Sequence, residues 1–117
     1  MAESICQANG ISCEFSYTSV FDSTINTEKE AAKAAKVARS LVGEDRVSTL
    51  FEPPMTSEDF AFMLQEKPGC YVLLGNDGAN SQNRGLHNPS YDFNDEILST
   101  GADFWVKLVE SECRPAT

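Results

Sequence analysis

The strongest constraint on the fold is a helical repeat in residues 27–43. Thr27 and Glu30 match the capping box that starts many helices, and Gly43 follows the last apolar position. Apolar residues recur every three or four positions between these limits: Ala31, Ala34, Ala35, Ala38, Leu41 and Val42. Because most of them are alanine, the repeat predicts a helix that packs closely against a sheet or another helix.

Three further segments predict strands. Apolar and polar residues alternate from Ile11 to Phe21, which is typical of a strand with one face in solvent. Cys70 to Leu74 is continuously apolar, as expected for a strand covered on both faces, and Val47 to Phe51 is a shorter candidate. We therefore expect an α/β fold in which a mixed sheet is flanked by helices.

Local signals predict three more helices. Ala2 to Asn9 is compatible with a helix that ends at Gly10, and Ser57 can cap a helix from Glu58 to Gln65. A final helix begins near residue 94. Its apolar positions are Ile97, Gly101, Phe104, Trp105 and Leu108.

Length and charge narrow the functional class. The 117 residues suffice for one small domain, and the net charge of -9 argues against nucleic acid and anionic membranes as partners. The chain has no apolar run of the roughly 18 residues that a membrane helix needs, nor the N-terminal pattern of a secretory signal, so we expect a cytoplasmic protein. We expect its four cysteines to be buried, reduced thiols, although the sequence is also compatible with a disulfide.

The segment Gly75 to Tyr91 is rich in Gly, Asn and Ser and is predicted to be a loop. At 17 residues it exceeds the length of most structureless connections, and it contains the single histidine, His87. Asp92 and Asp95 lie nearby, but zinc sites take three or four protein ligands, usually with two or more from His or Cys. The loop therefore does not predict a self-contained metal site, and His87 is either a surface residue or a ligand whose partners lie elsewhere.

Other catalytic patterns have less support. The chain has no G-x-S-x-G motif and only one histidine to serve as a base. Glu58 and Asp59 are neighbours on a predicted helix, where adjacent side chains point about 100° apart and do not converge. We interpret these two carboxylates as charges at the N-terminus of a helix.

Three stretches nevertheless resemble one enzyme family, in order and in spacing. They are residues 55–64 (MTSEDFAFML), 68–76 (PGCYVLLGN) and 85–95 (GLHNPSYDFND). Together they are similar to the C-terminal part of the zinc-dependent amidohydrolases of the aminoacylase and carboxypeptidase group, with the greatest likeness to hippurate hydrolases, the N-acyl amino acid amidohydrolases. Upstream, Tyr17 to Asn26 resembles the exit from the lid domain of this family.

The resemblance implies a division of the chain and a chemistry. Residues 1–22 would end the lid domain, which commonly forms a homodimer contact, and residues 27–117 would be the C-terminal part of the catalytic domain. Such enzymes use two divalent ions, zinc or manganese, to cleave N-acyl amino acids or small peptides. The general base and most metal ligands lie in the N-terminal part, so we expect this chain alone to be inactive.

The resemblance also assigns a few residues. His87 matches the last metal ligand of the family, while no catalytic residue is assigned to this chain. Ser57, Glu58 and Asp59 match a loop and helix start that line the substrate site or support the residues around the metals. The alternative hypothesis is a free-standing α/β interaction module that associates through the exposed edge of the strand Ile11 to Phe21.

Overall fold

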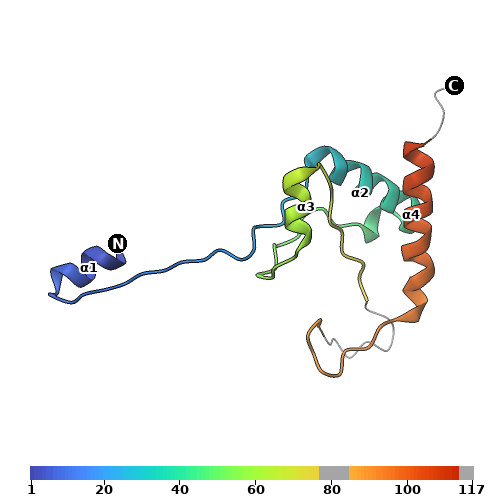
Figure 1. Cartoon of the computed structure of the whole chain (residues 1–117). Helices are drawn as coiled ribbons and strands as arrows, with labels where there is room; N and C mark the ends of the chain where they lie inside the picture. Colours follow the sequence, from blue (N-terminus) through green and yellow to red (C-terminus); the bar gives the residue numbers. More distant parts are fainter. Residues whose placement is uncertain (77–84, 114–117) are drawn as a thin grey trace.

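The fold of the described residues consists of helices joined by irregular segments. The computed structural model describes residues 1–76 and 85–113, and the part of the predicted loop at 77–84 lies outside them. Figure 1 shows α2, α3 and α4 together in one body, with α1 apart from it at the end of a long arm. The helices are α1 Ala2–Ala8, α2 Glu28–Val42, α3 Phe60–Glu66 and α4 Leu98–Glu112, with short 3-10 turns η1 Glu44–Arg46 and η2 Asp95–Ile97. Helices are thus confirmed in all four predicted regions.

Helices α2 and α4 pack against each other, as the alanine-rich face of α2 predicts. Ala34 and Val37 of α2 are buried, with exposed fractions of 6% and 7%. Lys33 of α2 forms an ion pair with Glu112 of α4, with 2.5 Å between Nζ and Oε2. The hydrogen bond to Glu112 is the largest cause that raises the pKa of the Lys33 ammonium. An apolar contact and a surface ion pair therefore join the two longest helices.

The start of α2 is tied to residues 69–71 by four hydrogen bonds. The Thr27 N–H donates to the Gly69 carbonyl at 2.9 Å, and the Thr27 hydroxyl accepts from the Gly69 N–H at 3.2 Å. The carboxamide of Asn26 donates to the Tyr71 carbonyl at 2.9 Å and accepts from the Tyr71 N–H at 2.7 Å. We call these four bonds the 26–71 clamp. Asn26 thereby makes the pair of hydrogen bonds that a neighbouring strand makes in a sheet.

The predicted capping box at the start of α2 is wrong. Thr27 occupies the N-cap position, but its side chain makes no capping hydrogen bond within the helix. The hydroxyl instead accepts the Gly69 N–H, and Glu30 Oε2 is left buried with no hydrogen-bond partner among the described residues. A tertiary contact has taken the acceptor that the local motif would have used.

Helix α1 ends as the sequence predicts, and the arm that follows it, residues 11–21, is exposed. Gly10 has a φ of 69°, the Gly10 N–H donates to the Gln7 carbonyl, and the Ile11 N–H donates to the Cys6 carbonyl. This pair of bonds is the Schellman motif, which needs a left-handed residue at Gly10. All residues from 11 to 21 are exposed, and Figure 1 shows them as an extended tail that leads to the body.

The predicted mixed sheet is absent from the described residues, so the α/β class expected from the sequence is wrong for this chain. The three predicted strands, at 11–21, 47–51 and 70–74, are irregular segments without ladder partners within residues 1–76 and 85–113. A strand exists only when a second strand accepts its backbone hydrogen bonds, and here the Tyr71 backbone is bonded to a side chain instead. The run 70–74 is also uncovered, since Val72, Leu73 and Leu74 are about half exposed.

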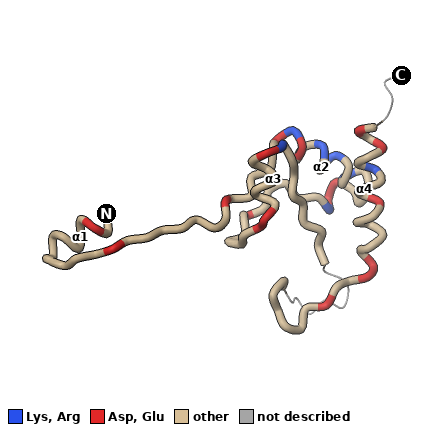
Figure 2. Tube along the Cα trace, in the orientation of Figure 1, with Lys and Arg blue, Asp and Glu red and all other residues tan. Residues whose placement is uncertain are grey.

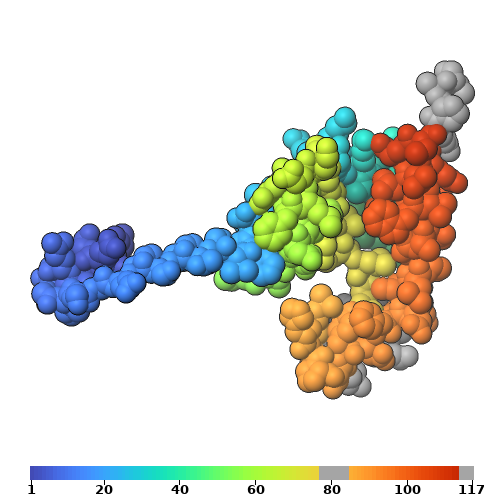
Figure 3. Space-filling view, viewed as in Figure 1, coloured from blue at the N-terminus to red at the C-terminus, as the bar shows by residue number. Residues whose placement is uncertain are grey.

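The chain leaves an unusually large surface open. Its accessible surface is 10378 Å², whereas a folded monomer of 12.8 kDa exposes about 6,300 Å². Its radius of gyration is 20.8 Å, against about 13 Å for a compact domain of this length. Figure 3 shows the arm and the separate lobes of the body that produce these values. Ala61, at 1% exposed, joins Ala34 and Val37 as the buried apolar residues of the described part.

The four cysteines are free thiols, and the expectation that they are buried is wrong. Cys13 and Cys113 are exposed, while Cys6 and Cys70 are half-buried. Burial, with a smaller effect from the Glu30 carboxylate, raises the pKa of the Cys70 thiol. No helix in residues 1–76 and 85–113 is long and apolar enough to cross a membrane.

Replacement of Asn26 by alanine tests the 26–71 clamp. Asn26→Ala removes two hydrogen bonds between the start of α2 and residue 71, and we expect the free energy of unfolding to fall by about 1–2 kcal/mol. Urea unfolding followed by circular dichroism at 222 nm measures this loss. Asn9→Ala is the matched control, because the Asn9 side chain bonds only to Ile5 within α1 among the described residues. An equal effect of both variants would contradict a special role for the clamp.

Candidate functional site

His87 lies in a turn that exposes its side chain and holds its backbone in a left-handed conformation. Its φ is 71°, the only positive value at a non-glycine residue among the described residues. The Asn88 N–H donates to the Gly85 carbonyl at 3.2 Å, which closes a turn with His87 at its third position. Type II turns require a positive φ at that position and usually have glycine or asparagine there. A histidine in this place is therefore a backbone outlier of the kind that concentrates at functional sites.

The segment that carries His87 is acidic. Residues 85–96 contain Asp92, Asp95 and Glu96 and no lysine or arginine. Figure 2 shows the positions of the basic residues concentrated on α2, in the body, and acidic residues along the segment that leads into α4. Negative charge close to an exposed imidazole favours a cation over an anion as the bound species.

Asn76 fixes the base of this segment, and sequence reasoning missed it. Its Nδ2 donates to the Asp92 carbonyl at 2.8 Å, and its Oδ1 accepts from the Asn94 N–H at 2.8 Å. Asn94 in turn caps η2 by accepting the Glu96 N–H at 3.0 Å. The sequence feature that could have indicated this role is the amide side chain at residue 76, which follows the apolar run 70–74 and Gly75. An asparagine in such a place can form hydrogen bonds with nearby backbone groups.

Ser57, Glu58 and Asp59 lie just before α3 rather than within it. The prediction that Ser57 caps a helix from Glu58 is wrong, because α3 begins at Phe60 with Asp59 at the N-cap position. The Ala61 and Phe62 N–H groups donate to the backbone carbonyls of Glu58 and Asp59. Neither acidic side chain caps the helix, so both are available for contacts elsewhere.

Glu58 makes such a contact with Tyr71. The charge of the Glu58 carboxylate acts on the Tyr71 phenol, and the Phe60 ring lies 5.5 Å from the Tyr71 ring between centroids. Burial is the largest cause that raises the pKa of Tyr71, followed by the charge and hydrogen bond of Glu58 and then the charge of Asp59. The structure therefore brings Glu58 and Asp59 close to Tyr71, which also belongs to the 26–71 clamp.

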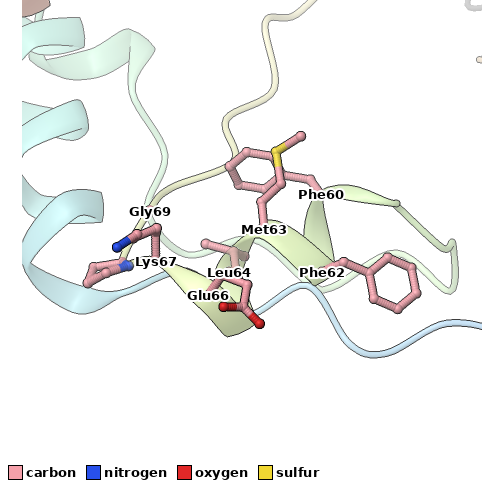
Figure 4. A pocket seen from close by; sticks show the side chains of 8 residues that line it. Phe60, Phe62, Met63, Leu64, Glu66, Lys67 and Gly69 are labelled. Atoms are coloured by element: carbon pink, nitrogen blue, oxygen red, sulfur yellow. The ribbon is translucent and has the colours of Figure 1, made fainter.

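An open apolar hollow of about 590 Å³ lies beside α3 (Figure 4). It contains none of the residues that the sequence singled out as a site. Its shape and apolar lining provide no group of convergent polar atoms, which a specific small-molecule site needs. The lining residues are Phe60, Phe62, Met63, Leu64, Glu66, Lys67, Pro68 and Gly69.

The donor atoms present do not form a metal site by themselves. In the part of the chain that the structure describes, no group of three His, Cys, Asp or Glu side chains could hold a metal ion. His87 is thus not assembled with Glu58 and Asp59 into a set of ligands. An exposed imidazole fits the role of one zinc or manganese ligand, provided that the other donors come from outside the described residues.

Comparison with known proteins identifies the family. The sequence profile of the family described as Peptidase family M20/M25/M40 matches residues 5–111. The chain therefore belongs to the M20/M25/M40 family of peptidases. This result confirms the resemblance to amidohydrolases and carboxypeptidases that the three motifs indicate.

Individual relatives have names that describe hydrolysis of small substrates. A hippurate hydrolase of Campylobacter jejuni is 34% identical over 108 residues, which cover 92% of this chain and 27% of that protein. The IAA-amino acid hydrolase ILR1-like 2 of Arabidopsis thaliana is 32% identical over 79 residues, covering 68% and 18%. Thermostable carboxypeptidase 1 of Saccharolobus solfataricus is 28% identical over 109 residues, covering 87% and 25%.

The chain spans about a quarter of the length of curated relatives that it matches. No solved structure matches it. The described part is therefore comparable with one portion of such hydrolases.

The Tyr71 environment gives a prediction for alkaline pH. Because the pKa of Tyr71 is raised in the folded chain, its contribution to stability is complete below pH 10.0 and is lost as pH rises through the higher folded value. Tyrosinate absorbance at 295 nm measures the titration, and subtraction of the Tyr71→Phe curve isolates this residue. We expect a midpoint above 10.0 that moves down in Glu58→Gln. A midpoint at or below 10.0 would show that the Glu58 contact is absent in solution.

Proposed function

We propose that the chain is the C-terminal part of a metal-dependent amidohydrolase that resembles hippurate hydrolase and cleaves the amide bond of N-acyl amino acids or small peptides. The observation that carries this proposal is the family match over residues 5–111, which includes the His87 segment. Relatives named as hydrolases of hippurate and of IAA-amino acids support the substrate class.

We assign residues 1–22 to the end of a lid domain and residues 27–117 to the catalytic domain. Helix α1 lies apart from the body (Figure 3) and residues 11–21 are exposed, which supports this division. Contact with α3 is made where the arm ends, with 6.2 Å between the ring centroids of Phe21 and Phe62. In the complete enzyme the lid would pair with a second copy, which gives a homodimer. The accessible surface of the chain, 10378 Å², supports the assignment to part of a larger enzyme. A domain of this mass that folds by itself exposes far less.

We assign His87 as a metal ligand in the complete enzyme. M20 enzymes generally use divalent metals. Two zinc or manganese ions, when bound, polarise the amide carbonyl of the substrate and activate water. The part of His87 is to present an imidazole nitrogen from an exposed turn, and the acidic residues around it favour a cation there. The remaining ligands and the general base belong to the part of the enzyme outside this chain.

We place Ser57, Glu58 and Asp59 at the edge of the substrate site. Their position before α3 and the effect of the Glu58 and Asp59 charges on Tyr71 support a role in shaping that edge rather than in bond cleavage. No catalytic residue is assigned within this chain. This chain contributes one metal ligand and residues that line the site around it.

The chain alone should be inactive. A single imidazole does not hold two ions, and the described residues offer no three-donor group. We expect no hydrolysis of hippurate or N-acetyl amino acids by the purified chain above the background of zinc or manganese alone. Turnover by the pure chain that exceeds this background would contradict the proposal.

The complete enzyme that contains this chain provides the positive control. There, His87→Ala should lower kcat/KM for hippurate by at least about a hundredfold and reduce the metal content, since loss of a ligand is more damaging than loss of a supporting residue. Ser48→Ala is a matched control, because Ser48 bonds only to the nearby Leu50 carbonyl among the described residues. Full activity of His87→Ala would remove the basis of the assignment.

A second candidate function is a non-catalytic interaction module. It is favoured by one observation: within the described residues, the backbone of residues 12–20 makes no backbone hydrogen bond, and its side chains are exposed. Unpaired N–H and C=O groups on an extended segment can pair with an equivalent segment of another chain.

Light scattering coupled to size-exclusion chromatography tests the module. Association through the arm predicts a mass of at least two chains that increases with concentration. Thr18→Pro, which removes one N–H and fixes φ, should shift the chain to a monomer. Glu52→Pro, in an irregular segment outside the arm, is the matched control. A chain that is strictly monomeric at high concentration excludes the module.

A further inference from the structure

We propose that Asn76 is a positioning residue that sets the place and backbone conformation of the His87 segment, defined here as residues 85–94. This inference rests on the proposed role of His87 as a metal ligand and extends it to a residue at the end of the motif 68–76.

Asn76 makes two hydrogen bonds to backbone atoms that are distant in sequence. It donates to the Asp92 carbonyl and accepts from the Asn94 N–H, each at 2.8 Å. One planar carboxamide thus fixes the backbone on both sides of residue 93. The bond to Asn94 is partly buried, which shields it from competition by water.

Short-range bonds continue from this point to His87. The Tyr91 N–H donates to the Asn88 carbonyl at 2.9 Å, and the Asn88 side chain accepts the Ser90 N–H at 2.9 Å. The Asn88 N–H closes the turn on Gly85 at 3.2 Å. These bonds form a continuous series of turns from residue 85 to residue 91, so a contact that holds residues 92–94 acts on the orientation of the whole series.

Leu74, two residues before Asn76, lies against α4, and this contact explains why Asn76 can act as an anchor. A Cβ atom at Gly101 would lie 3.6 Å from Leu74, so residue 74 runs directly against α4 two residues before Asn76. Asn94 leads into η2 and α4 through its bond to the Glu96 N–H. Asn76 therefore bonds the His87 segment at the place where the apolar run meets the last helix.

The backbone of His87 makes such an anchor necessary. A positive φ is unfavourable for a residue with a Cβ atom, and such conformations persist only where surrounding contacts hold them. The side chain of His87 is exposed and provides little packing. The bonds along residues 85–94, anchored by Asn76, are the contacts available for this purpose in the described structure.

The chemistry of the carboxamide dictates how variants should behave. Asparagine supplies one donor and one acceptor, whereas aspartate keeps only the acceptor and leucine of similar size keeps neither. Asn76→Leu should therefore free the segment, and Asn76→Asp should have an intermediate effect. Asn9→Leu is the matched control, because among the described residues the Asn9 side chain bonds only to the Ile5 carbonyl within α1.

The first test is hydrogen exchange in the 117-residue chain. We expect amides of residues 85–94 to exchange about tenfold faster in Asn76→Leu, with an intermediate rate in Asn76→Asp and an unchanged rate in Asn9→Leu. The coupling constant between the amide and α protons of His87 reports its φ and should change in Asn76→Leu. Unchanged exchange and coupling in Asn76→Leu would overturn the inference.

The second test measures zinc affinity of the complete enzyme by competition with a chelator, without any assay of activity. Asn76→Leu should weaken zinc binding about tenfold, as expected for a residue that orients a ligand, while Asn9→Leu should not. If His87→Ala weakens zinc binding and Asn76→Leu does not, the inference fails and the proposed function stands. If His87→Ala leaves zinc binding intact, the metal assignment fails, and faster exchange in Asn76→Leu would still support the positional role.

Discussion

The structure depends on side-chain amides that bond to the backbone where a sheet would supply a neighbouring strand. The Asn26 side chain forms hydrogen bonds with the backbone N–H and C=O of Tyr71. Thr27 forms hydrogen bonds with the backbone N–H and C=O of Gly69, through its hydroxyl and its own N–H. The Asn76 side chain makes a similar pair of hydrogen bonds, to the Asp92 carbonyl and the Asn94 N–H. Without these bonds, the apolar run 70–74 would have little to fix it, because its side chains are about half exposed.

The same constraint explains the open form of the molecule. Helices α2 and α4 bury a small alanine-rich contact, and the described residues contain no sheet on which the other apolar faces could pack. Membership of the M20/M25/M40 family and a span of about a quarter of the relatives' length give this surface a simple interpretation. On the proposed function, the rest of the enzyme covers these faces.

The candidate site follows from this arrangement. The chain offers an exposed imidazole on a left-handed turn, a local excess of acidic residues and a pair of carboxylates beside Tyr71. These elements lie on separate segments, and the described residues do not combine them into a group of metal donors. Both facts are explained if this chain supplies some residues of the site and the remaining part of the enzyme supplies the others.

The sequence by itself determined the features that depend on neighbours along the chain: the four helical regions, the left-handed Gly10 and Gly43 at helix ends, and the family, which three motifs in order indicated. Tertiary structure decided the rest. The prediction of a sheet was wrong for the described residues, because a strand forms only beside a partner strand. The capping box failed because Gly69 took the Thr27 hydroxyl, and Asn76 was missed because its partners are 16 and 18 residues away. Periodicity records which face of an element is apolar, whereas the partner of a hydrogen bond between distant residues is fixed only when the chain has folded.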